Sequence, residues 1–381
     1  MVGRQSRFVV LGLYLHIPFC SSICNYCNFN RGLFDGPLKT RYVAALQQDI
    51  LRAGRGEPVD TIYFGGGTPS LLEPAEIAAL IDDCRSVFDV EPGAEVTVET
   101  NPETASVPRL TGFREAGVNR LSFGVQSFQD SELARLGRVH SSARARDAVA
   151  EARAAGFDNV SLDLMMWLPG QSVEDWTGNV RALLEVGPEH VSFYLLELYP
   201  NAPLKDDMAR AGWSQAPDED AAAMYLEGLA ILDTAGYRQY EISNACVPDR
   251  ASRHNMKYWT DGEWHGFGCG AHSTRHGVRW QNVSATSEYI ARIDAHASAV
   301  ADRRRLTPAE RVEEAMFTGL RLTQGVDVEA VGRRYGVDVW GRFGAGLAPF
   351  LDRSLLLREG SRIRLSREGM LVANEVMQIF V

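Results

Sequence analysis

Hydrophobic and polar positions along this chain fall into two kinds of block that alternate. Short runs rich in β-branched and aromatic residues predict six strands, at 9–17, 61–66, 95–100, 120–128, 159–168 and 190–199. Alanine- and leucine-rich stretches with helical spacing lie between them, at 40–54, 73–88, 141–156 and 172–187. Strand and helix repeated six times predict an α/β fold with a parallel sheet, arranged as an open or closed barrel; a doubly wound sheet is the competing arrangement.

The alternation stops after a helix expected at 221–236 and a short extended segment at 237–243. The next segment, 244–282, is rich in glycine and aromatic residues, has four of the eight histidines, and resembles neither strand nor helix. We expect it to line or cover a site. The expected division is therefore a core at 1–243, a linking segment at 244–300 and a C-terminal domain at 301–381.

The C-terminal part has a different pattern. Helices are expected from Thr307 and near 327–335, followed by a hairpin around Glu359 and Gly360 and by a last helix. This order resembles a winged-helix domain, so we expect a small α+β domain at this end of the chain.

Composition narrows the classes of function. The chain has 381 residues, of which 45% are apolar and 23% charged, as expected of a soluble globular protein with one large and one smaller domain. With 39 basic and 49 acidic residues the formal charge is −10, which disfavours nucleic acid as a partner and a DNA-binding role for the winged helix. No apolar run is long enough for a transmembrane segment, and we interpret the N-terminal apolar run as a strand.

Three of the six cysteines, Cys20, Cys24 and Cys27, lie within eight residues directly after the first strand. Three thiolates in one loop can bind three irons of a cubane cluster and leave the fourth iron open. A zinc site is the alternative, with His16 as its fourth ligand. This use of cysteine also indicates a reducing compartment, and we expect the protein to be cytoplasmic.

Further polar groups follow the other expected strands. The second strand ends in Gly65-Gly66-Gly67-Thr68-Pro69, where glycines let backbone groups approach a ligand. Later strand ends supply further polar side chains: Glu99, Asn101, Gln126, Asp163 and, slightly beyond, Arg138. Since parallel strands end at one edge of the sheet, these groups suit a ligand with an amino acid end, a ribose and a cation.

The cysteine loop, GGGTP, VETNP, GVQSF, LGR and DLM with LPGQ resemble the radical S-adenosylmethionine superfamily, in its coproporphyrinogen dehydrogenase-like branch. The resemblance covers nearly the whole chain and implies a partial TIM-type barrel of six βα units. It implies a [4Fe-4S] cluster on Cys20, Cys24 and Cys27 that chelates S-adenosylmethionine. It further implies contacts to that ligand from Tyr14, Tyr26, Gly66, Gly67, Thr68, Glu99, Gln126, Arg138 and Asp163.

Within this branch, the anaerobic coproporphyrinogen III dehydrogenases have a further cysteine two positions after the third, where this chain has Phe29. The segment His254-Asn255-Met256-Lys257-Tyr258-Trp259 resembles the HNxxYW motif of HemW-type proteins, and EEAMFTGLRLTQGVD resembles their C-terminal domain. The chain also starts without the longer leader expected of the dehydrogenases. The HemW-type resemblance implies a heme chaperone that passes heme to an acceptor protein; a coproporphyrinogen III dehydrogenase is the alternative.

Two expectations concern the heme and the cavity. A neutral imidazole is a good axial ligand for heme iron, and the motif favours His254, with His265 and His272 as alternatives and Cys246 and Cys269 as further contacts. Trp167 stands where related chains have glycine, at the end of the fifth strand, and is expected to project into or beside the ligand cleft. A homodimer is compatible with the sequence.

Overall fold

A curved sheet forms the centre of the computed structural model, which describes residues 10–54 and 56–381. Its middle consists of six neighbouring parallel strands. They are β1 (Leu11–Ile17), β4 (Pro58–Gly66), β5 (Asp89–Thr100), β6 (Arg120–Gln126), β7 (Val160–Met166) and β8 (His190–Leu195). All six predicted strands are therefore present, with position 9 of the first one outside the described residues, and the partial barrel of βα units is confirmed.

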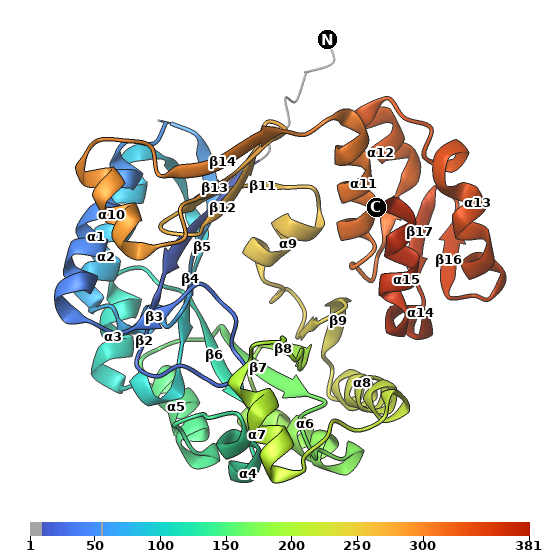
Figure 1. The fold of residues 1–381 in the computed structure, drawn as a ribbon, viewed down its shortest axis with the longest axis horizontal. Coiled ribbons are helices and arrows are strands. Elements are labelled where there is room, and N and C mark those ends of the chain that lie inside the picture. Colours follow the sequence, from blue (N-terminus) through green and yellow to red (C-terminus); the bar gives the residue numbers. More distant parts are fainter. Residues whose placement is uncertain (1–9, 55) are drawn as a thin grey trace.

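Helices cover the outer face of this sheet (Figure 1). They are α1 (Gly36–Leu51), α2 (Pro74–Val87), α3 (Val107–Glu115), α5 (Ser142–Ala154), α6 (Val173–Val186) and α8 (Asp218–Thr234). Two shorter helices, α4 (Asp130–Arg135) and α7 (Pro203–Ala211), lie near the carboxyl ends of the strands. Helix α6 shows why the local sequence is helical: Ser172 and Asp175 form a capping box, and Gly187 ends the helix in the left-handed conformation.

The sheet continues beyond the parallel strands at both edges, because segment 244–282 is not irregular. Next to β1 lies the parallel strand β11 (Glu263–Phe267), followed by antiparallel β12 (His272–Arg275), β13 (Val278–Asn282) and β14 (Val300–Arg305). At the other edge, β10 (Asn244–Cys246) and β9 (Arg238–Glu241) extend β8. The expectation of neither strand nor helix here was wrong.

Short length and a distant partner explain that error. The strands have three to six residues, and β11 pairs with β1, which lies some 250 positions earlier in the chain. One local signal was available in the sequence, Gly277, which forms with His276 the two-residue turn between β12 and β13, where both residues have positive φ. Strands on both sides of residue 243 share one sheet, and the predicted domain boundaries stay a prediction.

Helix α9 (Arg253–Trp259) lies on the inner side of the sheet, where Figure 1 shows it apart from the outer helices. Its Tyr258 ring packs edge to face on Trp264 of β11, with ring centroids 4.7 Å apart. The segment expected to cover a site therefore supplies a helix that plugs the barrel interior.

The C-terminal part is a small α+β unit, as predicted. Helix α10 (Thr286–Asp294) still packs on α1, and the following unit contains α11 (Pro308–Gly319), α12 (Val328–Tyr335), α13 (Val339–Asp352), α14 (Arg367–Leu371) and α15 (Ala373–Met377). Its small sheet has the order β15 (Val326–Asp327), β17 (Arg362–Leu365), β16 (Leu356–Glu359). The predicted hairpin is confirmed, with Gly360 in the left-handed conformation at its turn.

The remaining short elements are β2 (Phe19–Cys20) and β3 (Gly32–Leu33) at the base of the cysteine loop, η1 (Pro69–Leu71) after β4, η2 (Pro102–Thr104) after β5, and η3 (Gln378–Phe380) at the chain end. No helix in the described ranges is long and apolar enough to cross a membrane.

Candidate functional site

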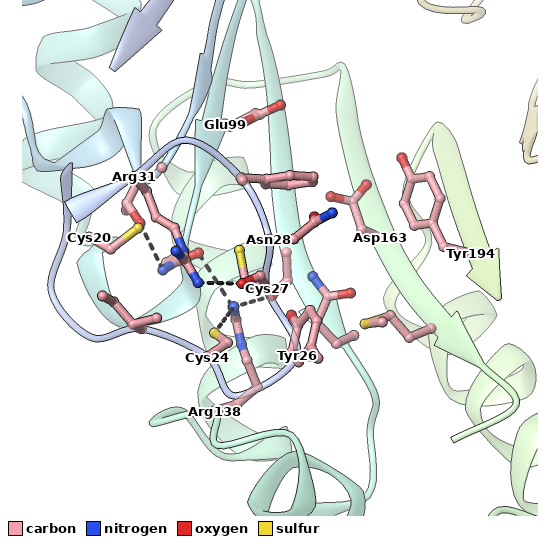
Figure 2. A pocket seen from close by; sticks show the side chains of 18 of the residues that line it. Cys20, Cys24, Tyr26, Cys27, Asn28, Arg31, Glu99, Arg138, Asp163 and Tyr194 are labelled. Atoms are coloured by element: carbon pink, nitrogen blue, oxygen red, sulfur yellow. Dashed lines mark hydrogen bonds between the residues drawn. The ribbon is translucent and has the colours of Figure 1, made fainter. Parts of the chain in front are cut away.

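A cavity of about 390 Å³ lies at the carboxyl ends of the parallel strands, where a barrel of this kind places its ligands. Strands β4 to β8 supply one wall, and the loop that contains the three cysteines supplies the other. Figure 2 shows Cys20, Cys24 and Cys27 on one side of the space and Asp163 and Tyr194 on the opposite side. Most of the residues predicted from the sequence line this one cavity: Cys20, Cys24, Tyr26, Cys27, Gly66, Gly67, Thr68, Glu99, Asn101, Gln126, Arg138 and Asp163.

The cysteine loop is closed at its base and held at two asparagines. Strands β2 and β3 pair at Phe19 and Gly32, which brings the two ends of the loop together. Asn25 donates to the carbonyl oxygen of Arg135 at 2.9 Å and to Asp207 Oδ2 at 3.0 Å, which ties the loop to α4 and α7. The loop is therefore anchored to the barrel before any ligand binds.

The second anchor is Asn30. Its side-chain amide donates to the backbone carbonyl oxygens of Cys269 at 3.2 Å and Ser284 at 3.0 Å. The backbone carbonyl oxygen of Asn30 lies 2.8 Å from His16 Nε2. The other ring nitrogen of His16 is hydrogen-bonded to the Tyr14 hydroxyl at 3.1 Å. With both nitrogens engaged, His16 is a structural support of the loop rather than the fourth ligand that a zinc site would need.

The donor set fits a cluster better than a single ion. Within residues 10–54 and 56–381, no group of three or more His, Cys, Asp or Glu side chains is placed to hold one metal ion. A cubane cluster does not need several side chains around one ion, because each of its cysteines binds a different iron. Cys20, Cys24 and Cys27 are free, half-buried thiols on one cavity wall, which suits three irons with a fourth facing the cavity.

Arg138 connects the cysteine loop to the strand ends. Its guanidinium donates to Cys24 Sγ at 3.4 Å, to the carbonyl oxygen of Gly124 at 2.6 Å and to Asn101 Oδ1 at 3.4 Å. The Arg138 side chain therefore ties Cys24 to the ends of β5 and β6.

Two carboxyl groups, Glu99 and Asp163, lie across from the cysteines (Figure 2). Glu99 accepts hydrogen bonds from the Tyr63 hydroxyl at 2.8 Å and from the Gly66 amide at 3.0 Å. The pKa of Glu99 is raised to about 7, mainly by burial and to a smaller extent by the nearby Asp163, while the two hydrogen bonds lower it. Burial likewise raises the pKa of Asp163 to about 6. The cavity therefore gains negative charge near neutral pH and suits a cationic ligand.

The glycine run is needed for packing within the protein. A Cβ on Gly66 would come within 2.5 Å of the His16 ring, and one on Gly67 would come within 2.7 Å of the Phe19 carbonyl oxygen. Gly66 also has φ +118°, a conformation that other residues rarely adopt. Glycine thus lets the end of β4 lie directly against β1 and the base of the cysteine loop, and its backbone still borders the cavity.

Two residues predicted at ligand sites lie elsewhere. Tyr14 is on the inner face of β1 below the cavity, stacked on Tyr63 with ring centroids 6.2 Å apart. His254 is only 1% exposed on α9 and stacks on Tyr63, with a centroid distance of 5.0 Å. Its Nδ1 is hydrogen-bonded to Thr61 Oγ1 at 2.8 Å and its Nε2 to the Tyr258 hydroxyl at 3.0 Å. In this arrangement neither ring nitrogen is available to iron.

The alternatives to His254 are distributed differently. His265 lies on β11 against Phe267, beside a separate cavity of about 240 Å³, and His272 is exposed at the start of β12. Cys246 and Cys269 are buried in the core, as is Cys84 on α2. Heme ligation by any of these side chains stays a prediction.

Trp167 does not project into the cavity. It directly follows β7 with φ +62°, and its indole Nε1 donates to the Ala216 carbonyl oxygen at 2.8 Å on the segment between α7 and α8. Glycine adopts the left-handed conformation without strain, which explains why it suits this position. The same conformation turns the Trp167 side chain away from the cavity.

Several lining residues were not found from the sequence: Ser22, Ile23, Asn28, Arg31, Thr100, Ser122, Met165, Tyr194, Leu195, Leu196, Glu197 and Tyr199. Strand alternation could have found Ser122 and Met165, which stand two positions from Gly124 and from Asp163 on the same faces of β6 and β7. The segment after β8 offered no comparable signal.

Comparisons with known proteins show the family to which this chain belongs. Residues 14–183 match the family model of the radical SAM superfamily, and residues 306–372 match that of the HemN C-terminal domain. A heme chaperone HemW from Bacillus subtilis is 36% identical over 97% of this chain and 98% of its own length. A heme chaperone HemW from Mycobacterium tuberculosis is 37% identical over 96% of this chain and 94% of its own length. The chain belongs to the HemW family of radical SAM proteins.

The chain is also similar to a mammalian protein. A mouse protein, radical S-adenosyl methionine domain-containing protein 1, mitochondrial, is 37% identical over 98% of this chain and 88% of its own length. Among solved structures, HemN from Escherichia coli, described as a coproporphyrinogen III oxidase and radical SAM enzyme, superposes with a TM-score of 0.87. That match covers 98% of this chain and 91% of HemN at 23% identity, so it shows a shared fold.

Proposed function

We propose that this protein binds heme and passes it to an acceptor protein. Similarity over nearly the whole chain to proteins named heme chaperones is the observation that carries the proposal. The alternative is the coproporphyrinogen III dehydrogenase reaction, supported by the fold shared with HemN. Phe29 argues against that alternative, because the resemblance places a further cysteine of the dehydrogenases at this position.

We also propose that the cavity holds a [4Fe-4S] cluster and S-adenosylmethionine. Cys20, Cys24 and Cys27 would bind three irons, with Arg138 beside Cys24. When bound, such a cluster supplies an electron to the sulfonium of S-adenosylmethionine. Gly66, Gly67 and Thr68 would hold the methionine end of the ligand, Glu99 and Asp163 the ribose region, and Tyr26 and Gln126 the contacts between them.

Several features of these residues suit that role. Gln126 has φ +68°, a strained conformation for a residue other than glycine, and such strain gathers at ligand sites. Glu99 and Asp163 would offset the positive sulfonium when ionised. The three cysteines require reducing conditions, so we place the protein in the cytoplasm.

Heme titration tests the chaperone function. Hemin added to anaerobically purified protein is expected to give a shifted Soret band at one heme per chain. The loaded protein should then convert an apo-hemoprotein to its heme form faster than free hemin does. Failure of the purified protein to bind hemin would contradict the proposal.

The enzymatic alternative has its own readout. Reconstituted protein incubated anaerobically with coproporphyrinogen III, a reductant and S-adenosylmethionine would yield vinyl products if it were a dehydrogenase. We expect no vinyl product. Vinyl product without transferable heme would replace the chaperone proposal by the enzymatic one.

A further inference from the structure

Large apolar side chains gather around the mouth of the cavity. Five side chains that line it are between 38% and 65% exposed: Ile23, Phe29, Tyr194, Leu195 and Tyr199. Two belong to the cysteine loop and three to the end of β8 and the residues that follow, so they face the opening from two sides. We call these five residues the apolar rim.

Single exposed apolar residues are normal on a protein surface, but a group around an opening marks a binding site. Elsewhere in the described ranges, Leu33 and Phe34 form an exposed pair at the far end of the cysteine loop, and other such side chains lie on separate elements, as Leu51 does on α1 and Phe317 on α11. The apolar rim also differs from the interior of the cavity, whose wall is polar at Glu99, Ser122, Gln126 and Asp163.

The two zones suit two different ligands. The polar interior fits a small charged molecule, as proposed above for S-adenosylmethionine. Apolar side chains at the entrance would instead add to the binding of an apolar ligand, which the polar interior does not suit.

We infer that the apolar rim is the docking surface for heme, which lies across the mouth of the cavity with its macrocycle on Phe29, Leu195 and Tyr199. This inference rests on the proposed function, because it takes heme as the cargo. The Tyr199 hydroxyl donates to Glu197 Oε2 at 2.8 Å, which holds that ring in place. Phe29 is the most exposed rim residue, and it stands where the related dehydrogenases have a cysteine.

Charge complementarity favours heme over a purely apolar partner. Arg31 lines the same cavity and uses Nη2 for the Cys27 carbonyl oxygen, while its buried Nε has no hydrogen-bond partner among the described residues. The positive charge of Arg31 at this cavity matches a macrocycle that has propionate groups at one edge. A rim at the surface also lets the cargo leave, as a chaperone requires.

The test replaces Phe29 and Leu195 by serine in one chain and uses Leu51 and Phe317 as a matched control pair. The control residues are the same two residue types, exposed by 47% and 38% on distant elements. Hemin titration followed at the Soret band should show affinity at least about tenfold weaker for the rim pair and unchanged for the control pair. Binding of radiolabelled S-adenosylmethionine to both reconstituted variants should equal that of the unchanged protein.

Each outcome decides one statement. Equal hemin affinity in the rim pair and the unchanged protein would overturn the inference while the heme chaperone proposal stands. Equal weakening in both pairs would also overturn it, because the effect would not be local to the rim. Normal hemin affinity with slower transfer to an apo-hemoprotein would make the rim a protein-docking surface and would overturn the inference as well. Absence of hemin binding in the unchanged protein would instead contradict the proposed function.

Discussion

His16 Nε2 lies 2.8 Å from the carbonyl oxygen of Asn30, so the first strand of the barrel holds the far end of the cysteine loop. Burial lowers the pKa of His16, which keeps the imidazole neutral. A neutral ring can donate from Nε2 to Asn30 and accept at Nδ1 from Tyr14. This buried histidine therefore links the barrel interior to the candidate cluster site.

Replacing His16 by alanine is expected to loosen the cysteine loop. Leaving a buried hydrogen-bonding group without its partner costs about 1–3 kcal/mol. We expect fewer irons and less acid-labile sulfide per chain after anaerobic reconstitution of His16→Ala. Tyr14→Phe is the matched control, since it removes only the bond at Nδ1 and should keep most of the iron. Full iron content in His16→Ala would show that the loop needs no such support.

The second prediction concerns pH and Glu99. Because the pKa of Glu99 is about 7 in the folded protein and near 4.5 when unfolded, the folded state holds an extra proton between these values. The contribution of protonated Glu99 to the free energy of unfolding is therefore fully present below pH 4.5. It is lost as the pH rises from 4.5 through 7. We therefore compare the free energy of unfolding of Glu99→Gln with that of the unchanged protein, both ligand-free. The difference should shift by about 1–3 kcal/mol in favour of Glu99→Gln between pH 5 and pH 8.

Urea unfolding at the two pH values measures this difference. Glu197→Gln is a suitable control, because this carboxyl group is exposed at the same cavity. A stability difference between Glu99→Gln and the unchanged protein that does not vary with pH would mean that Glu99 titrates normally.

The barrel and most of its ligand wall could be predicted because their signals are local. Buried parallel strands appear as continuous apolar runs, and their polar carboxyl ends must meet at one edge. That placed Glu99, Gln126 and Asp163 with the cysteines without any structure. The short strands β11 to β13 could not be found in the same way, since the pairing of β11 with β1 depends on residues far apart in the chain.

Side-chain direction was the other limit. A motif shows which residue type stands at a position but not which way the backbone turns it. His254 sits on a helix that enters the barrel, and Trp167 follows a strand with positive φ, so both point away from the cavity. Neither feature follows from hydrophobic periodicity, because each is set by packing between distant segments.

The third prediction follows from Trp167. Trp167→Gly should relieve a left-handed backbone that costs roughly 1–2 kcal/mol, but it also removes the indole and its hydrogen bond to Ala216. We expect the free energy of unfolding to fall by about 1–2 kcal/mol, because the buried part of the ring stabilises the fold by more than the strain costs. Thermal unfolding measures this change. Binding of S-adenosylmethionine should be unchanged. Tighter or weaker binding in Trp167→Gly would place this side chain at the ligand after all.

The last prediction separates structural from ligand roles for His254. With both ring nitrogens bonded to Thr61 and Tyr258, the ring contributes to the packing between α9 and β4. Burial lowers the pKa of His254 to about 3, so the ring stays neutral down to acidic pH and its bonds are those of a neutral imidazole.

His254→Ala is expected to lower the free energy of unfolding by about 2–4 kcal/mol, through two lost hydrogen bonds and a cavity. It should leave hemin affinity unchanged in the folded fraction. His276→Asn, at an exposed position in the turn between β12 and β13, is the control for a histidine without such packing. Thermal unfolding and Soret titration on the same samples give both readouts. Loss of hemin binding in a fully folded His254→Ala would show instead that α9 opens and offers this imidazole to the iron.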